Sequence, residues 1–168
     1  MPLMSDEFIE FKNRAADRTT DPEAVVGLFL EALVTLERDE TLGTQKMALL
    51  LAPGQLSPDP SALSGQRISR MGMESVRRLL RNANIARSYV GGSYQRGYAD
   101  FSPDDLRVTL DRSNPRSGLD YPSPGRAKYF VFSGGADSAR PITLTRTDDG
   151  AWKVHEYSSL TTGVRKPA

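Results

Sequence analysis

The residue types that most often carry out catalysis are scarce in this sequence. His155 is the only histidine, and the chain contains no cysteine. A nucleophilic triad needs a histidine, and most zinc sites need several histidines or cysteines. His155 alone could act as a general base. A half-exposed strand position beside Lys153 and Tyr157 explains it more simply, so we predict no catalytic residue, no metal site and no cofactor.

Two pairs of adjacent carboxylates, Asp104-Asp105 and Asp148-Asp149, could be considered for general acid–base chemistry. Neighbouring side chains on a strand point to opposite faces, so neither pair would converge on one bond. The second pair belongs to the stretch TDDG, and the first follows a Ser-Pro turn signal. We therefore predict that both pairs shape turns.

The stretch GGSYQRGY, residues 91–98, raises the possibility of a phosphate-binding loop. A loop of the Walker type requires GxxxxGK[ST] between a strand and a helix. Gly92 and Gly97 have the required separation, but Tyr-Ala follows them, and we expect no helix there whose N-terminus could bind an anion. We predict a bend between strands, with an exposed contact surface formed by Tyr94, Arg96 and Tyr98.

The clearest charged pattern lies in residues 66–84, which we predict to be one helix. Its charged residues fall within about 100° of each other on a helical wheel, opposite the apolar ones. They are Arg67, Arg70, Glu74, Arg77, Arg78 and Arg81. Such a ridge suits an acidic protein surface or a nucleic-acid backbone. It could also be a solvated face, or it could pair with the acidic first two helices.

Hydrophobic periodicity divides the chain into a helical first half and a sheet-forming second half. Helices are expected at 5–18, at 22–36 with Asp21 as N-cap and Pro22 in the first turn, from Thr41 or Thr44 to Ala52, and at 66–84. Strands are expected near 86–90 and at 105–110, 128–132, 141–145 and 151–157. This order predicts an α+β fold, in which about four N-terminal helices pack on one face of a C-terminal antiparallel sheet of about five strands.

The last hairpin can be predicted in register. A three-residue loop at 148–150 would place Gly150 in the left-handed conformation and pair Leu144 with Val154 and Arg146 with Trp152. That register gathers Ile142, Leu144, Trp152 and Val154 on one apolar face. It places Thr143, Thr145, Lys153, His155 and Tyr157 on the other, polar face.

Length and charge bound the class of protein. The 168 residues fit a single domain over 1–168, with a helical half at 1–84 and a sheet half at 85–168. A net charge of +1 argues against a dedicated nucleic-acid-binding protein. No signal peptide or membrane-spanning run is recognisable. We expect a cytoplasmic protein without membrane contacts, unless a machine that needs no cleavable signal exports it.

The second half resembles an uncharacterised bacterial domain family. The resemblance rests on the Gly-Gly turn followed by Gly-Tyr, on the Arg-Pro that comes before the penultimate strand in RPITLTRTDDG, and on the ending WKVHEYSSLTTGVRKP. It covers about 80 residues well and the helical half loosely. Since the family has no established activity, it assigns no catalytic residue. It implies a context in secretion-linked or toxin-linked gene neighbourhoods.

A weaker resemblance, carried by GAWKVHEYS, is to NTF2-like folds, which enclose a pocket between a curved sheet and helices. Four helices before the sheet depart from that pattern. The leading hypothesis is a non-catalytic protein-binding module, an adaptor or immunity-type protein, with an acidic protein surface as its partner. The alternative is an NTF2-like protein or enzyme that binds a small molecule. A cavity lined by Trp152 would favour the alternative.

Overall fold

The computed structural model describes residues 5–168 and begins with three helices, α1 (Asp6–Arg18), α2 (Pro22–Thr35) and α3 (Glu40–Leu50). Each starts at a side-chain cap. Ser5 Oγ accepts from the amide of Phe8, Asp21 Oδ1 accepts from the amide of Glu23, and Asp39 Oδ1 accepts from the amide of Leu42. The predicted cap at Asp21 is therefore confirmed.

Two sheets follow these helices. The small one pairs β1 (Leu56–Pro58) with β2 (Gln66–Ile68), and the main one has the antiparallel order β3-β4-β5-β6. The main strands are β3 (Gly118–Leu119), β4 (Arg126–Val131), β5 (Arg140–Arg146) and β6 (Trp152–Glu156). The remaining elements are helices α4 (Gly72–Arg81) and α5 (Asn84–Arg87) and 3₁₀ turns η1 (Pro53–Gln55), η2 (Tyr94–Arg96) and η3 (Ser158–Thr161). The protein is thus an α+β protein, with four strands in its main sheet rather than five.

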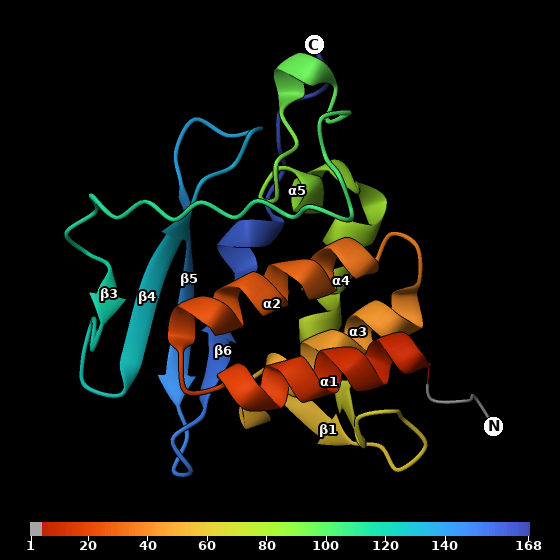
Figure 1. The fold of residues 1–168 in the computed structure, drawn as a ribbon, viewed down its shortest axis with the longest axis vertical. Helices are drawn as coiled ribbons and strands as arrows, with labels where there is room; N and C mark the ends of the chain where they lie inside the picture. The colour runs from red at the N-terminus through yellow and green to blue at the C-terminus, as the bar shows by residue number, and fades with distance from the viewer. Residues whose placement is uncertain (1–4) are drawn as a thin grey trace.

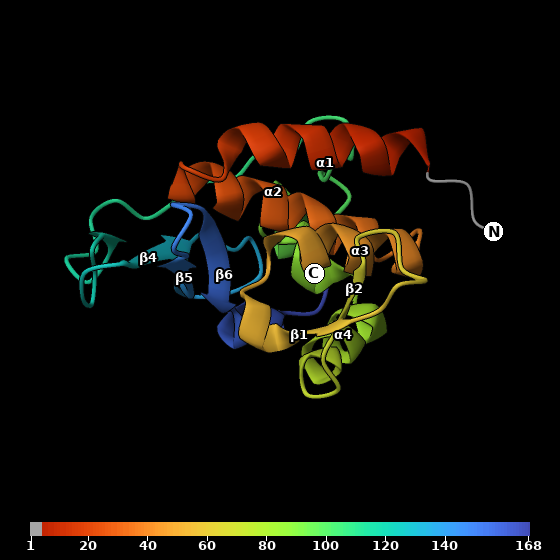
Figure 2. The same ribbon diagram turned by 90° about the horizontal axis from the view of Figure 1, so that it is seen from below.

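The helices form layers over the sheet. Figure 1 shows α2 crossing the main sheet, and Figure 2 shows α1 outside α2, with α4 and the β1–β2 hairpin on the opposite side of the molecule from α1. Helix α2 packs between α1, α3 and the sheet, which matches the apolar character of most of its surface. One continuous hydrophobic core joins the helices to the inner face of the sheet.

The predicted register of the last hairpin is confirmed. Leu144 faces Val154 and Arg146 faces Trp152, while Gly150 has a φ of +87°. Ile142, Leu144, Trp152 and Val154 are all buried.

A register shift between Thr143 and Leu144 changes the prediction at the end of the hairpin. Thr143 faces Glu156, so His155 is the extra residue of a bulge. The bulge turns Tyr157 inward, and its ring meets Phe29 edge-on with 4.8 Å between centroids. Placing Tyr157 on the polar face was therefore wrong.

Residues 66–84 are not one helix. Residues 66–68 pair with β1, and the helix begins only at Gly72, whose amide donates to Ser69 Oγ at 3.2 Å. The buried side chain of Gln45 fixes the preceding segment, because its Nε2 donates to the carbonyl of Gln66 and its Oε1 accepts from the amide of Ser64. These tertiary hydrogen bonds override the helical periodicity of the sequence.

Two predicted strands also differ. Residues 86–90 lie in α5 and the turn after it, because Asn82 Oδ1 accepts from the amide of Asn84 and starts a helical turn. Residues 105–110 form no strand, but their exposure alternates as predicted, with Leu106, Val108 and Leu110 packed against the core. They meet β4 only at its end, where Leu110 bridges to Val131.

Candidate functional site

The predicted arginine ridge divides into free and engaged residues. Arg67 on β2, Arg70 before α4 and Arg81 at the end of α4 are exposed. Within residues 5–168, no carboxylate lies at ion-pair distance from any of the three. Arg67 nevertheless lies near Asp59, whose pKa is lowered by hydrogen bonds from Ser61 and by the charge of Arg67. The guanidinium groups of Arg70 and Arg81 face solvent.

The other two arginines of the ridge form contacts within the protein. Arg77 forms an ion pair with Glu74 one turn earlier, with Nη1 and Oε1 2.7 Å apart, and both side chains remain about half exposed or more. Arg78 donates from Nε to Thr161 Oγ1 and from Nη2 to Ser75 Oγ, each at 3.0 Å. Arg78 therefore ties α4 to η3 and has fewer donors left for a partner.

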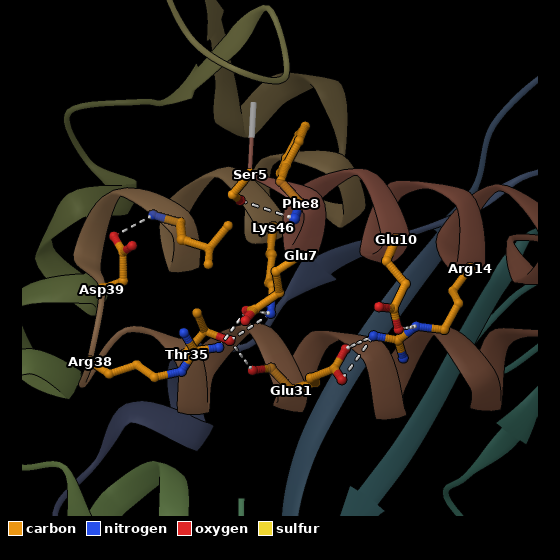
Figure 3. A network of polar contacts seen from close by, with 11 residues as sticks. Ser5, Glu7, Phe8, Glu10, Arg14, Glu31, Thr35, Arg38, Asp39 and Lys46 are labelled. Carbon is orange, nitrogen blue, oxygen red and sulfur yellow. Dashed lines mark hydrogen bonds and ion pairs between the residues drawn. The ribbon is translucent and has the colours of Figure 1, made fainter. Parts of the chain in front are cut away.

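The acidic first helices do not neutralise this surface. Figure 3 shows that acidic side chains of α1 and α2 pair with basic side chains of these helices, of α3 and of the α2–α3 connection. The pairs of these helices are Glu7 with Arg38 and Lys46, Glu10 and Glu31 with Arg14, and Glu23 with Arg112. The structure thereby excludes one reading of the ridge, its docking on the N-terminal helices.

Figure 3 also contains a buried charge that the sequence pattern did not reveal. Lys46 is 2% exposed, and its Nζ donates to Glu7 Oε2 at 2.8 Å and to Thr35 Oγ1 at 2.9 Å. Its ammonium lies 5.0 Å from the centre of the Phe11 ring. Burial alone would raise the pKa of Glu7, but the hydrogen bonds from Lys46 and Arg38 outweigh it and lower that pKa. This cluster stabilises the helical layer.

The GGSYQRGY turn binds the C-terminal tail of the chain. Tyr98, predicted to be exposed, is fully buried, and its hydroxyl donates to the carbonyl of Arg165 at 2.6 Å. The guanidinium of Arg165 lies 4.8 Å above the Tyr94 ring, and the amide of Ala168 donates to the carbonyl of Tyr94. Of the three predicted contact residues, only Arg96 is exposed, whereas Tyr94 is partly buried. The apolar side chains of Leu160 and Val164 in the tail pack on the core, which brings the tail against this turn.

The glycines of this turn allow two loops to approach closely. Gly92 and Ser93 lie against Gly134, where an added Cβ would stand 2.0 Å from the carbonyl oxygen of Gly92. The amides of Gly92, Ser93 and Gly134 donate to Arg87 O, Asp100 Oδ1 and Ser88 O. Because these donors are already used, the turn is not a phosphate cradle.

The remaining chemical candidates have structural partners. Asp149 Oδ1 accepts from the amide of Ala151, so the predicted turn role of that pair is confirmed. His155 belongs to the exposed residues, although part of its ring is shielded from solvent. This partial burial and the nearby Arg126 lower the pKa of His155. The neighbouring Glu156 accepts a hydrogen bond from the amide of Ser158 at 2.7 Å. In the described part of the chain, no group of three or more carboxylates or histidines could hold a metal ion.

The best-formed pockets lie at the surface. Trp152 is 3% exposed and lines none of five surface pockets found in residues 5–168. The deepest layer between α2 and the sheet is filled by side chains of the core. The cavity that would favour an NTF2-like pocket is not among these five.

None of the helices described for residues 5–168 is both long and apolar enough to cross a membrane.

Comparisons with other proteins place the chain in a family. Searches of curated proteins and of solved structures found no match. A family model described as a domain of unknown function (DUF6935) matches residues 4–168, which agrees with the resemblance to an uncharacterised domain family. The chain therefore belongs to the DUF6935 family.

Proposed function

We propose that this protein is a non-catalytic protein-binding module, of the adaptor or immunity type, that binds an acidic protein surface. The binding site would be the arginine surface, which we define as Arg67, Arg70, Arg77 and Arg81. One observation carries the proposal: three of these four residues are exposed and have no ion-pair partner within residues 5–168. Unpaired arginines suit carboxylates because the guanidinium group offers several donors in a planar arrangement.

The surroundings of this surface support a protein partner. Met71, at the start of α4, is 87% exposed, and Leu80 near its end is 38% exposed. Methionine and arginine are both enriched at protein interfaces. A nucleic-acid partner fits less well, because the chain has a net charge of only +1.

Capture from a nuclease-treated lysate of the source organism tests the proposal. The wild type is compared with an Arg70→Glu, Arg77→Glu, Arg81→Glu variant and with a control variant, Lys12→Glu, Arg18→Glu, Arg116→Glu. The three control residues are exposed and form no ion pair within residues 5–168, and the change in net charge is the same in both variants. Circular dichroism establishes that all three proteins fold.

We expect one protein to be retained by the wild type and the control variant and lost from the α4 variant. A partner retained by all three proteins would move the site away from the arginine surface. A partner that is retained only when the nuclease is omitted from a parallel capture would indicate nucleic acid instead. The absence of any partner for the wild type would overturn the proposal.

A further inference from the structure

The loops of the GGSYQRGY turn border a pocket that the arginine surface does not include. Its volume is about 430 Å³. It lies between residues 88–93, residues 107–109 and residues 132–134, which directly follow β4. The glycines make room for it, because a Cβ on Gly91 would stand 3.3 Å from Arg107 Nη2. Pockets of this size accommodate small organic molecules.

Two opposite charges line this pocket without pairing. Arg107 has no carboxylate at ion-pair distance within residues 5–168, and its side chain donates no hydrogen bond there. Asp100 also lines the pocket, and it accepts from the amide of Ser93 at 2.8 Å and from Ser93 Oγ at 2.7 Å. A carboxylate has about four lone-pair positions, so about two remain free.

The hydrogen bonds from Ser93 also fix the charge of Asp100. They lower its pKa, and the nearby Arg96 contributes to the same direction, so the side chain is ionised at neutral pH. A simple anion would be repelled by Asp100, and a simple cation would be repelled by Arg107. Only a molecule that carries both charges is attracted by both side chains.

An aromatic ring completes the pocket. Phe132 is 48% exposed, although the preceding residue, Val131, is fully buried in the core. Its ring therefore lines the outer face of the sheet beside Thr109, which faces the same side as Arg107. An exposed ring next to unpaired charges suits a ligand that has an apolar part.

We propose that this pocket binds a small zwitterion of the α-amino-acid class. The carboxylate lies on Arg107, the ammonium group lies on Asp100, and the side chain packs on Phe132. The amides of Gly92, Ser93 and Gly134 take no part, because they donate to groups of the protein itself. This site is independent of the arginine surface and of the proposed protein partner.

Amide chemical shifts of the full chain test this proposal. L-phenylalanine, L-leucine, L-serine, L-glutamate and L-lysine are titrated separately to millimolar concentration. We expect at least one to shift the amides of Gly91, Gly92, Ser133 and Gly134 in a saturable manner. For the strongest binder, the analogue without the ammonium group and the analogue without the carboxylate should each bind at least about tenfold more weakly, since each loses a charge-assisted hydrogen bond.

Two variants locate the site. Arg107→Gln should weaken binding at least about tenfold and should fold normally, because the Arg107 side chain makes no hydrogen bond in the part of the chain that is described. Arg116→Gln, an exposed arginine outside the pocket, should leave binding unchanged. No shift with any of the five amino acids would overturn the proposal. Equal binding of either analogue, or no effect of Arg107→Gln, would also overturn it.

Discussion

At the scale of single residues, the most consequential charge is that of Lys46, the one buried lysine, arginine, aspartate or glutamate among residues 5–168. Glu7→Gln leaves its ammonium group with only the Thr35 hydroxyl and a neutral amide as partners. We expect a loss of about 1–3 kcal/mol in the free energy of unfolding, measured by urea denaturation. Glu10→Gln is the control, because Glu10 is 74% exposed and lies 3.8 Å from Arg14. It should cost about 0–0.5 kcal/mol, and equal losses in the two variants would contradict the role of Lys46.

The same pair predicts a pH dependence. The pKa of Glu7 is lowered from its ordinary value of 4.5, so the unfolded chain takes up this proton at a higher pH than the folded one. The stabilisation is therefore fully present above pH 4.5 and is lost as the pH falls through the lowered value. We expect the difference in unfolding free energy between the wild type and Glu7→Gln to shrink in acid. A difference that grows in acid would contradict this assignment.

Glycine substitutions distinguish close packing from flexibility. Gly134→Ala would place a Cβ 2.0 Å from the carbonyl oxygen of Gly92, so we expect a loss of about 1–3 kcal/mol or more in stability. Gly27→Ala in α2 meets no atom within 4 Å and should instead add about 0.5–1 kcal/mol through helix propensity. Thermal unfolding of both variants measures the two signs. A neutral Gly134→Ala would show that the two loops do not pack as described.

At the scale of elements, Arg140 at the start of β5 attaches the C-terminal tail. Its Nη1 donates to the carbonyl of Thr162 at 2.8 Å, and its Nη2 donates to that of Gly163 at 2.6 Å. Arg140→Met should release the tail and remove the hydrogen-exchange protection of the amides of Arg165 and Ala168. Exchange in α2 should remain unchanged. Protection of the tail that persists in the variant would show that Leu160 and Val164 hold it without Arg140.

Local chemistry accounts for the elements that the sequence predicted correctly. The cap at Asp21 and the turn at Gly150 depend on neighbouring residues, so they and the register of the hairpin could be read in advance. The start of the helix within 66–84 could not be predicted, because the buried side chain of Gln45 on α3 decides it through hydrogen bonds to Ser64 and Gln66. The bulge at His155 is also set by the partner strand, and it reversed the side of Tyr157.

The candidate site was predictable only as a set of residue types. Exposed arginines near α4 were recognised, but their freedom from ion pairs depends on where Glu7, Glu23 and Glu31 lie in space. Tyr98 was predicted to face a partner, and it faces the C-terminal tail instead. No periodicity in the sequence indicates that Asp100 and Arg107 line one pocket.

At the scale of the whole molecule, the charges are segregated. Acidic residues of helices α1 and α2 form ion pairs with basic residues of their own and neighbouring segments (Figure 3). Arg67 on β2, Arg70 and Arg81 have no ion-pair partner within residues 5–168. Such a distribution would attract the proposed acidic partner to one side of the protein. We therefore expect association with the partner to weaken as ionic strength rises, as measured by its association rate constant. A rate constant independent of salt would contradict electrostatic attraction.

The most direct test is the dissociation constant of the captured partner for three proteins: the wild type, the Arg70→Glu, Arg77→Glu, Arg81→Glu variant and the Lys12→Glu, Arg18→Glu, Arg116→Glu control. We predict that the first variant raises the dissociation constant at least about a hundredfold, because each reversed residue exchanges attraction for repulsion. The control should match the wild type within a fewfold. Equal dissociation constants for the two variants would contradict the arginine surface as the binding site.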